Sequence, residues 1–78
     1  MKEQIRSYIV ENLLKNEVAI TDDSELYSSG LLSSMAHLKL VNFIERTFDV
    51  TIPIRDISIN NFDTINQIVE FTSKIANE

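Results

Sequence analysis

Apolar residues recur at intervals of three and four in three stretches of the chain, and this periodicity restricts the fold more than any other feature. It predicts helices over residues 3–15, 34–48 and 64–76. The first apolar stripe consists of Ile5, Ile9 and Leu13, widened by Tyr8, Val10 and Leu14, and the last of Ile65, Ile68, Val69, Thr72 and Ile75. Helices this short are marginal alone, so packing of their stripes must hold them together.

The segments between these helices complete the predicted fold. Residues 16–33 form a long connection with an acidic, solvated first part, and five apolar side chains should pin it to the core: Val18, Ile20, Leu26, Leu31 and Leu32. Residues 50–54 alternate like a strand, but Pro53 and the lack of a second strand favour an extended segment whose isoleucines fill the bundle. A helical turn should follow near residues 55–59. The predicted fold class is all-α, a small four-helix bundle with three main helices and one short one.

The second helix carries two separate apolar stripes. At 100° per residue, four side chains fall on one core-facing arc: Leu40, Val41, Ile44 and Phe48. Met35, Leu38 and Asn42 form another arc, here called the outer stripe, which the core does not need. It is either a docking surface or packs against the long connection. His37 falls within the core arc, where it is either a hydrogen-bonded residue at the core rim or the lining of a pocket.

Helix capping gives two pairs of candidates. Ser33 or Ser34 begins the second helix, and Asp63 or Thr64 begins the last, because their side-chain oxygens can accept hydrogen bonds from free backbone N–H groups. A serine at a helix N-terminus could also carry a phosphodiester, since that terminus favours negative charge. Helix physics alone leaves both interpretations of the serines open.

The composition excludes several classes of function. There is no cysteine and only one histidine, so thiolate and multi-histidine metal sites within the chain are excluded. Gly30 stands alone, which excludes a glycine-rich nucleotide loop. A net charge of −5 without a basic patch argues against nucleic acid. Without a membrane-spanning stretch or a signal-peptide core, we expect a cytoplasmic binding or carrier module rather than an enzyme.

Three segments carry a resemblance to a known family: ELYSSGLLSSM at 25–35, LVNFIERTFDVTIP at 40–53 and NFDTI at 61–65. In this order and spacing they resemble the acyl and peptidyl carrier proteins, the phosphopantetheine-binding family. The GLLSSM stretch at 30–35 is most similar to D-alanyl carrier proteins and to free-standing carriers of peptide or polyketide assembly. The resemblance covers nearly the whole chain and implies a single carrier domain over residues 1–78.

The resemblance implies a covalent 4′-phosphopantetheine on Ser34, which is followed by Met35 as in the family. Ser33 stands where the family usually has aspartate, which makes it a nominal rival site. The domain would need no catalytic residue or metal, because the arm's thiol holds the cargo as a thioester for partner enzymes. The implied docking residues are Met35, Leu38, Lys39 and Asn42.

The implied partners are a phosphopantetheinyl transferase, an ATP-dependent acyl or aminoacyl ligase, and downstream transferases or synthases, all acting on a monomer. Lys39 and Arg46 stand where carriers of fatty-acid synthesis often have acids, so the docking electrostatics should differ from theirs. A carrier of fatty-acid synthesis remains an alternative. Another is a small helical adaptor that binds a partner through Met35 and Leu38 without a prosthetic group.

Overall fold

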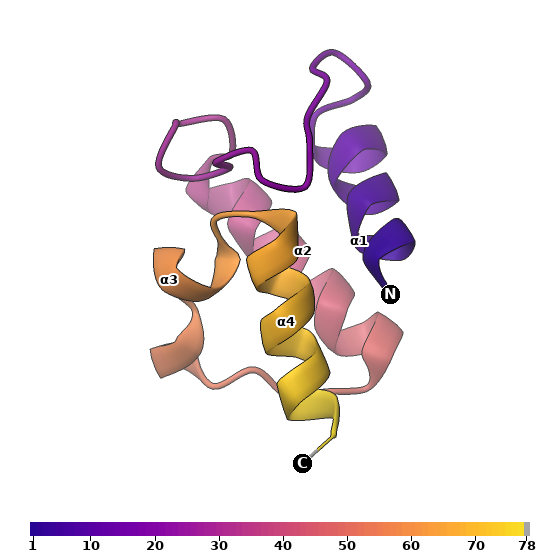
Figure 1. The fold of residues 1–78 in the computed structure, drawn as a ribbon, viewed down its shortest axis with the longest axis vertical. Helices are drawn as coiled ribbons and strands as arrows, with labels where there is room; N and C mark the ends of the chain where they lie inside the picture. The colour runs from indigo at the N-terminus through magenta and orange to yellow at the C-terminus, as the bar shows by residue number, and fades with distance from the viewer. Residues whose placement is uncertain (78) are drawn as a thin grey trace.

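A computed structural model describes residues 1–77, whose regular elements are all helical and include no strand. The elements are α1 (Lys2–Tyr8), continued by a π-helical turn (Ile9–Leu13), α2 (Ser34–Phe48), a 3₁₀ turn (Ile54–Asp56), α3 (Ile59–Phe62) and α4 (Ile65–Ala76). Figure 1 shows α1, α2 and α4 arranged around the centre, with the short α3 beside α4 and the connection from α1 to α2 crossing one end. The predicted small four-helix bundle is confirmed.

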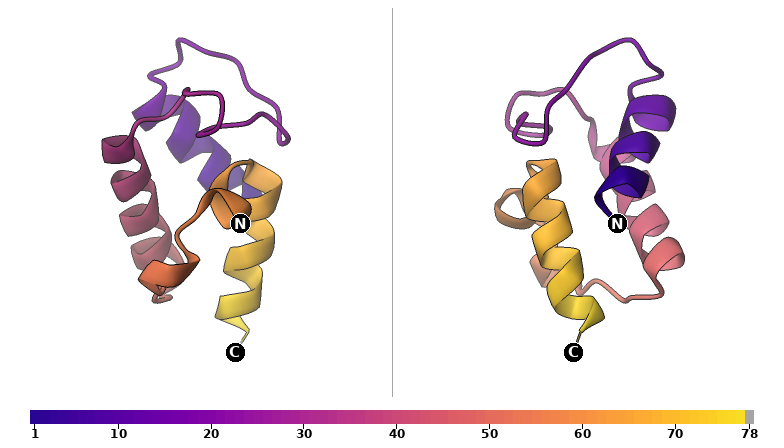
Figure 2. Two further views of the ribbon diagram at one scale, coloured as in Figure 1. Left: turned by 90° about the vertical axis from the view of Figure 1, so that its left-hand side faces the viewer. Right: turned by 45° about the vertical axis from the view of Figure 1, so that its right-hand side comes forward.

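One hydrophobic core joins all four helices. Figure 2 shows the backbone of these helices from two further sides. Its fully buried apolar side chains are Ile5, Ile9, Leu26, Leu40, Ile44, Phe62, Ile65 and Ile68. The core face predicted for α2 is confirmed: Leu40, Val41 and Ile44 are buried, and Phe48 packs against the core while partly buried at the C-terminal end of the helix. The outer stripe remains outside this core.

The first helix is shorter than predicted and ends in a wider turn. The Leu14 N–H donates to the Ile9 carbonyl five residues earlier, at 2.9 Å, where an α-helix reaches back four. Because a π turn holds more residues than an α turn, Leu14 rather than Leu13 falls beside Ile9 and is buried. Lys15, predicted to end the helix, lies outside it with a left-handed φ of 52°.

Four of the five predicted apolar residues pin the long connection to the core. Leu26 and Leu32 are buried, while Ile20 and Leu31 are partly buried. The prediction for Val18 is wrong: it is exposed, because it lies at the turn that leaves α1, before the chain returns to the core.

The acidic first part of the connection is not simply solvated. Asp22 accepts hydrogen bonds from the Arg6 guanidinium and, at 3.3 Å, from Lys2 Nζ. Arg6 also donates to the Ile20 carbonyl at 3.1 Å. Exposed ion pairs contribute little stability, but these contacts fasten the connection to the outside of α1.

The segment after α2 is extended without forming a strand. The Glu45 carboxylate accepts a hydrogen bond from the Ile52 N–H at 2.9 Å, which turns the buried Ile52 toward the core. The prediction that Ile54 also fills the bundle is wrong: it is 87% exposed, because the chain curls into the 3₁₀ turn there. The short helix is also displaced, since α3 begins at Ile59, where the predicted helical turn ends.

The last helix begins after Thr64, which is one of its two predicted cap residues. Thr64 is the cap: its hydroxyl accepts from the Gln67 N–H at 3.1 Å, and the Gln67 side chain accepts from the Thr64 N–H at 3.1 Å. This reciprocal pair satisfies the free donors of the first turn. Asp63, the other candidate, therefore has its carboxylate free for contacts elsewhere.

Candidate functional site

Ser33 and Ser34 occupy different positions at the start of α2. Ser33 is the cap residue, and its hydroxyl accepts a hydrogen bond from the Ala36 N–H at 3.2 Å. Ser34 is the first helical residue, is exposed, and has no side-chain hydrogen bond within residues 1–77. The capping role is thus filled by one serine, which leaves the other hydroxyl free at the positive end of a 15-residue helix.

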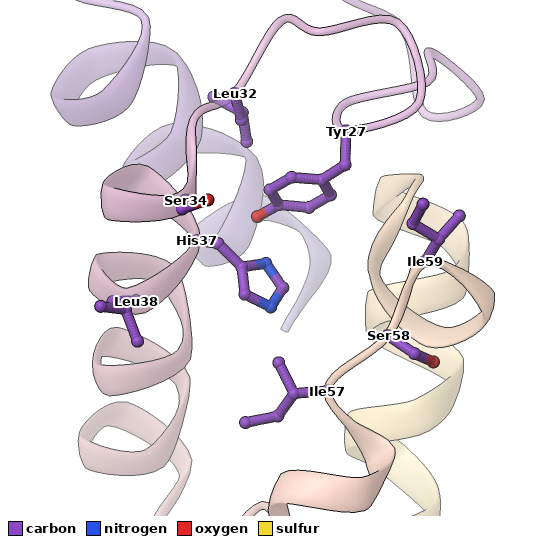
Figure 3. Close-up of a pocket in the computed structure, with 8 residues that line it drawn as sticks. All are labelled: Tyr27, Leu32, Ser34, His37, Leu38, Ile57, Ser58 and Ile59. Atoms are coloured by element: carbon purple, nitrogen blue, oxygen red, sulfur yellow. The ribbon is translucent and has the colours of Figure 1, made fainter.

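A pocket of about 530 Å³ opens directly beside Ser34. Its walls are Tyr27, Leu32, Ser34, His37, Leu38, Ile57, Ser58 and Ile59. Figure 3 shows α2 on one side, the segment that enters α3 on the other, and the ring of Tyr27 above. None of these side chains is an acid, a lysine or an arginine, so the pocket presents apolar surface and neutral polar groups.

His37 is packed by aromatic rings instead of being held by a hydrogen bond. Its imidazole lies edge-on to Tyr27 at 4.5 Å between ring centroids and to Phe62 at 5.5 Å. The expected hydrogen bond is missing, because Nδ1 is buried without a partner among the described residues. Burial lowers the pKa of His37 below its ordinary value of 6.5, so the ring is neutral at pH 7. The structure places it in the pocket wall.

Tyr27 is positioned by Asp63, a contact that sequence reasoning missed. The Asp63 carboxylate accepts hydrogen bonds from the Tyr27 N–H at 2.8 Å, the Ser28 N–H at 3.0 Å and the Ser28 hydroxyl at 2.6 Å. Although burial opposes ionisation, these bonds lower the pKa of Asp63 below its ordinary value. The signal for this contact in the sequence was Asp63 itself, the aspartate of NFDTI, which capping preferences mark only as a candidate helix cap.

The hydroxyl of Tyr27 is the second polar group without a partner at the pocket. It is buried and makes no hydrogen bond within residues 1–77. Burial and, to a lesser degree, the nearby Asp63 charge raise the pKa of Tyr27, which therefore stays a neutral phenol. In Figure 3 this hydroxyl points toward α2, on the side of Ser34 and His37.

The four residues predicted for docking do not lie on one surface. Met35 and Leu38 are 63% and 59% exposed, and Leu38 also lines the pocket. Lys39 and Asn42 instead border a second groove of about 310 Å³ between α1 and α2, formed with Tyr8, Phe43, Arg46 and Thr47. In that groove the rings of Tyr8 and Phe43 are stacked at 4.1 Å.

Residues 1–77 lack two other kinds of site. No group of three or more acidic or histidine side chains there could hold a metal ion. None of the helices in the same range is both long and apolar enough to cross a membrane.

Comparison with known proteins gives a consistent result. Residues 3–72 match the family model described as "Phosphopantetheine attachment site". A D-alanyl carrier protein of Streptococcus sanguinis is 30% identical over 69 residues, covering 88% of this chain and 87% of the relative. A D-alanyl carrier protein of Lactobacillus delbrueckii subsp. bulgaricus is 34% identical over 56 residues, covering 72% of this chain and 70% of the relative. No solved structure matches significantly.

Proposed function

This chain belongs to the phosphopantetheine attachment family, and we propose that Ser34 is the residue that carries its phosphopantetheine. The observation that supports this choice is the different surroundings of two adjacent hydroxyls. Ser33 is engaged as the helix cap, whereas Ser34 is exposed and unbonded among the described residues. The start of α2 suits a phosphodiester, because the helix N-terminus favours negative charge.

The surroundings of Ser34 fit such a group. No acidic side chain lines the adjacent pocket, so a phosphate on Ser34 meets no like charge there. Apolar walls and unpartnered polar atoms lie next to it. When bound, phosphopantetheine supplies a terminal thiol that holds an acyl or aminoacyl group as a thioester, a nucleophile that this cysteine-free chain lacks.

The modification step requires a partner enzyme. Ser34 Oγ forms a bond to the phosphorus that bears pantetheine in coenzyme A, and the bond from that phosphorus to adenosine 3′,5′-bisphosphate breaks. The hydroxyl proton passes to the phosphopantetheinyl transferase, because no carboxylate lines the pocket beside Ser34. We propose the cytoplasm as the site of action, where coenzyme A and ATP are available.

The carrier role leaves the chemistry to other enzymes. We propose that a dedicated ATP-dependent ligase loads the arm with an acyl or aminoacyl group, and that downstream transferases or synthases remove it from the monomeric carrier. Lys39 and Arg46 support a partner other than a fatty-acid synthase. Neither side chain makes an ion pair within residues 1–77. A fatty-acid-pathway enzyme that presents its own basic surface would be repelled there.

The test is the intact mass after incubation with coenzyme A and a broad-specificity phosphopantetheinyl transferase. The unmodified chain should gain one phosphopantetheine, Ser33→Ala should still gain it, and Ser34→Ala should gain none. Modification of Ser34→Ala would show that the site is Ser33 or another residue. No gain by the wild-type chain would instead favour the adaptor without a prosthetic group.

A further inference from the structure

The groove between α1 and α2 brings together two cations that the rest of the fold leaves without an ion pair. Its lining consists of Tyr8, Lys39, Asn42, Phe43, Arg46 and Thr47. Neither Lys39 nor Arg46 forms a salt bridge within residues 1–77, and both side chains are exposed. No acidic residue lines the groove, although the whole chain has a net charge of −5. The groove is therefore a local positive surface on an acidic protein.

Lys39 and Arg46 stand at a regular spacing along α2. They are seven residues apart, so they lie on one face of the helix and about 10 Å apart along its axis. Asn42 and Phe43 lie on the turn between them. This face of α2 thus presents a cation, then a polar and an apolar side chain, and then a second cation.

The middle of the groove is apolar and held in place. The rings of Tyr8 and Phe43 are stacked, with their centroids 4.1 Å apart and their planes inclined by 14°. The Tyr8 hydroxyl donates to the Lys39 carbonyl at 3.4 Å, which ties the ring from α1 to α2. Both rings are only partly buried, so apolar surface remains for a ligand between the two cations.

The charge and the shape of the groove together distinguish between ligands. Two carboxylates about 10 Å apart would each meet a cation, and acids seven residues apart on a helix have this separation. The residues three and four positions after the first acid share its face and would cover the rings. An extended polyanion, such as a nucleic acid or an anionic membrane, would also meet the acidic remainder of the chain and be repelled. A narrow acidic helix avoids that repulsion.

We propose that the groove between α1 and α2 docks an acidic amphipathic helix of a partner protein. Lys39 and Arg46 pair with two carboxylates of that helix. Its apolar side chains cover the rings of Tyr8 and Phe43.

This docking site is separate from the attachment residue. The pocket beside Ser34 lies between α2 and the segment that enters α3 (Figure 3), whereas the groove lies between α2 and α1. Around the axis of α2, Ser34 is about 120–140° from the two cations. A docked helix therefore leaves Ser34 accessible, and a partner protein can hold the carrier while the arm is in use.

Three synthetic peptides, each held helical by a staple on its far face, test this proposal. The first carries two glutamates seven positions apart, with leucines three and four positions after the first glutamate, on a background of alanine and glutamine. The second has glutamine in place of both glutamates. The third keeps both glutamates but places them five positions apart, so that its net charge equals that of the first while one acid leaves the shared face. Each peptide is titrated into the isotope-labelled full chain and followed by NMR.

The expected result is specific to the first peptide. It should shift the amide resonances of residues 39–47 and the ring resonances of Tyr8, and leave the methyl groups of Ile57 and Ile59 in the Ser34 pocket unchanged. The second peptide should bind about fivefold more weakly, the effect of two exposed ion pairs, and the third about twofold more weakly. The unmodified and the phosphopantetheinylated carrier should bind the first peptide equally well, because Ser34 does not line the groove.

A matched pair of double variants isolates the two cations. Lys39→Gln with Arg46→Gln removes them, so the first and second peptides should bind this variant equally. Lys15→Gln with Arg55→Gln removes two other exposed cations without an ion pair in residues 1–77, and changes the net charge by the same amount. This control should keep the fivefold difference. All four changes are at exposed positions, so both variants should fold.

Several outcomes would overturn the docking proposal. No detectable binding, equal binding of the three peptides, or shifts centred on the Ser34 pocket would each do so. Tighter binding to phosphatidylglycerol vesicles than to the first peptide would assign the groove to a membrane surface instead. Shifts of the groove resonances with carrier concentration alone would assign it to a second copy of the chain. Failure to attach phosphopantetheine to Ser34 would contradict only the proposed function, because peptide binding is also measured on the unmodified chain.

Discussion

The Ser28 hydroxyl donates a hydrogen bond of 2.6 Å to the carboxylate of Asp63, and so links the long connection to the residue at the C-terminal end of α3. The same carboxylate accepts from the backbone N–H groups of Tyr27 and Ser28. One ionised side chain thereby fixes the segment that carries Tyr27, whose ring forms part of the pocket wall. Hydrogen bonds to a charged group are among the stronger ones in proteins.

Asp63→Asn should therefore lower the free energy of unfolding by about 2–3 kcal/mol, because an amide loses the charge and one acceptor oxygen. Urea denaturation at pH 7 measures this. The matched control is Asp23→Asn, an exposed aspartate that also accepts a hydrogen bond, from Asn66, and it should change stability by less than about 0.5 kcal/mol. Similar losses in both variants would contradict the anchoring role of Asp63.

The Asp63 contacts also predict a dependence on pH. Because the folded-state pKa of Asp63 lies below its ordinary value of 3.8, the stabilisation is present above pH 3.8 and is lost as the pH falls toward the folded pKa. The Asn variant should lack this part of the acid transition. Unfolding curves of both proteins between pH 5 and pH 2 measure the difference.

His37 predicts a second, separate pH effect. Its pKa is lowered by burial, so the unfolded chain takes up a proton near pH 6.5 while the folded chain stays neutral. Stability should fall as the pH drops below 6.5, down to the folded pKa. His37→Phe should show no slope between pH 7.5 and pH 5.5, since His37 is the chain's single histidine. Equal slopes in the two proteins would mean that the imidazole is not desolvated.

The two serines at the start of α2 should differ in their contributions to stability. Ser33→Ala removes the cap and should cost about 1 kcal/mol, whereas Ser34→Ala removes no hydrogen bond and should stay within about 0.5 kcal/mol. Ser33→Asp keeps a good capping residue at this position and introduces the residue that is usual in the family, so this variant should be as stable as wild type. Chemical denaturation of the three variants tests the order. A larger loss of stability for Ser34→Ala than for Ser33→Ala would mean that Ser34, and not Ser33, is the helix cap.

The two faces of α2 should separate stability from partner recognition. Ile44→Ala should destabilise by about 2–4 kcal/mol, because Ile44 is fully buried and its truncation leaves a cavity. Leu38→Ala, at an exposed position, should cost less than about 1 kcal/mol but should slow loading by the partner ligase. Equal stability losses would place Leu38 in the core and the docking surface elsewhere.

Charge reversal on α2 tests the choice of partner. A malonyl transferase of fatty-acid synthesis should load the wild-type carrier poorly, and the double variant Lys39→Glu with Arg46→Glu should be loaded faster, because like charges at the interface are removed. Lys15→Glu, an exposed change outside the helices, is the control and should have no effect. Efficient malonylation of the unmutated carrier, with no loading by a ligase encoded nearby, would return the protein to fatty-acid synthesis.

The helices and the two stripes of α2 could be predicted because they depend on local periodicity. Leu40, Val41 and Ile44 repeat at helical spacing, and burial follows from that spacing alone. For the same reason, the cap of α4 could be narrowed to two candidates, Asp63 and Thr64. These features involve contacts within a few positions of the chain.

The remaining features depend on contacts between distant residues. Leu14 rather than Leu13 is buried because of the π turn at the end of α1, which the apolar periodicity does not mark. The exposure of Ile54 follows from the curl of the chain into a 3₁₀ turn that periodicity does not mark. The anchoring of Tyr27 by Asp63 joins residues 36 positions apart, and no local pattern encodes it.

Leu38 belongs both to the exposed face of α2 and to the lining of the pocket. A protein that docks on this face therefore covers part of the pocket rim, and a group inside the pocket alters the surface that the protein meets. Because the coupling between two binding events is reciprocal, whatever the cargo does to a partner's affinity, the partner does equally to the cargo's affinity for the pocket. Through this one leucine, a partner enzyme would distinguish a carrier that is loaded with cargo from an unloaded one before the enzyme contacts the thioester.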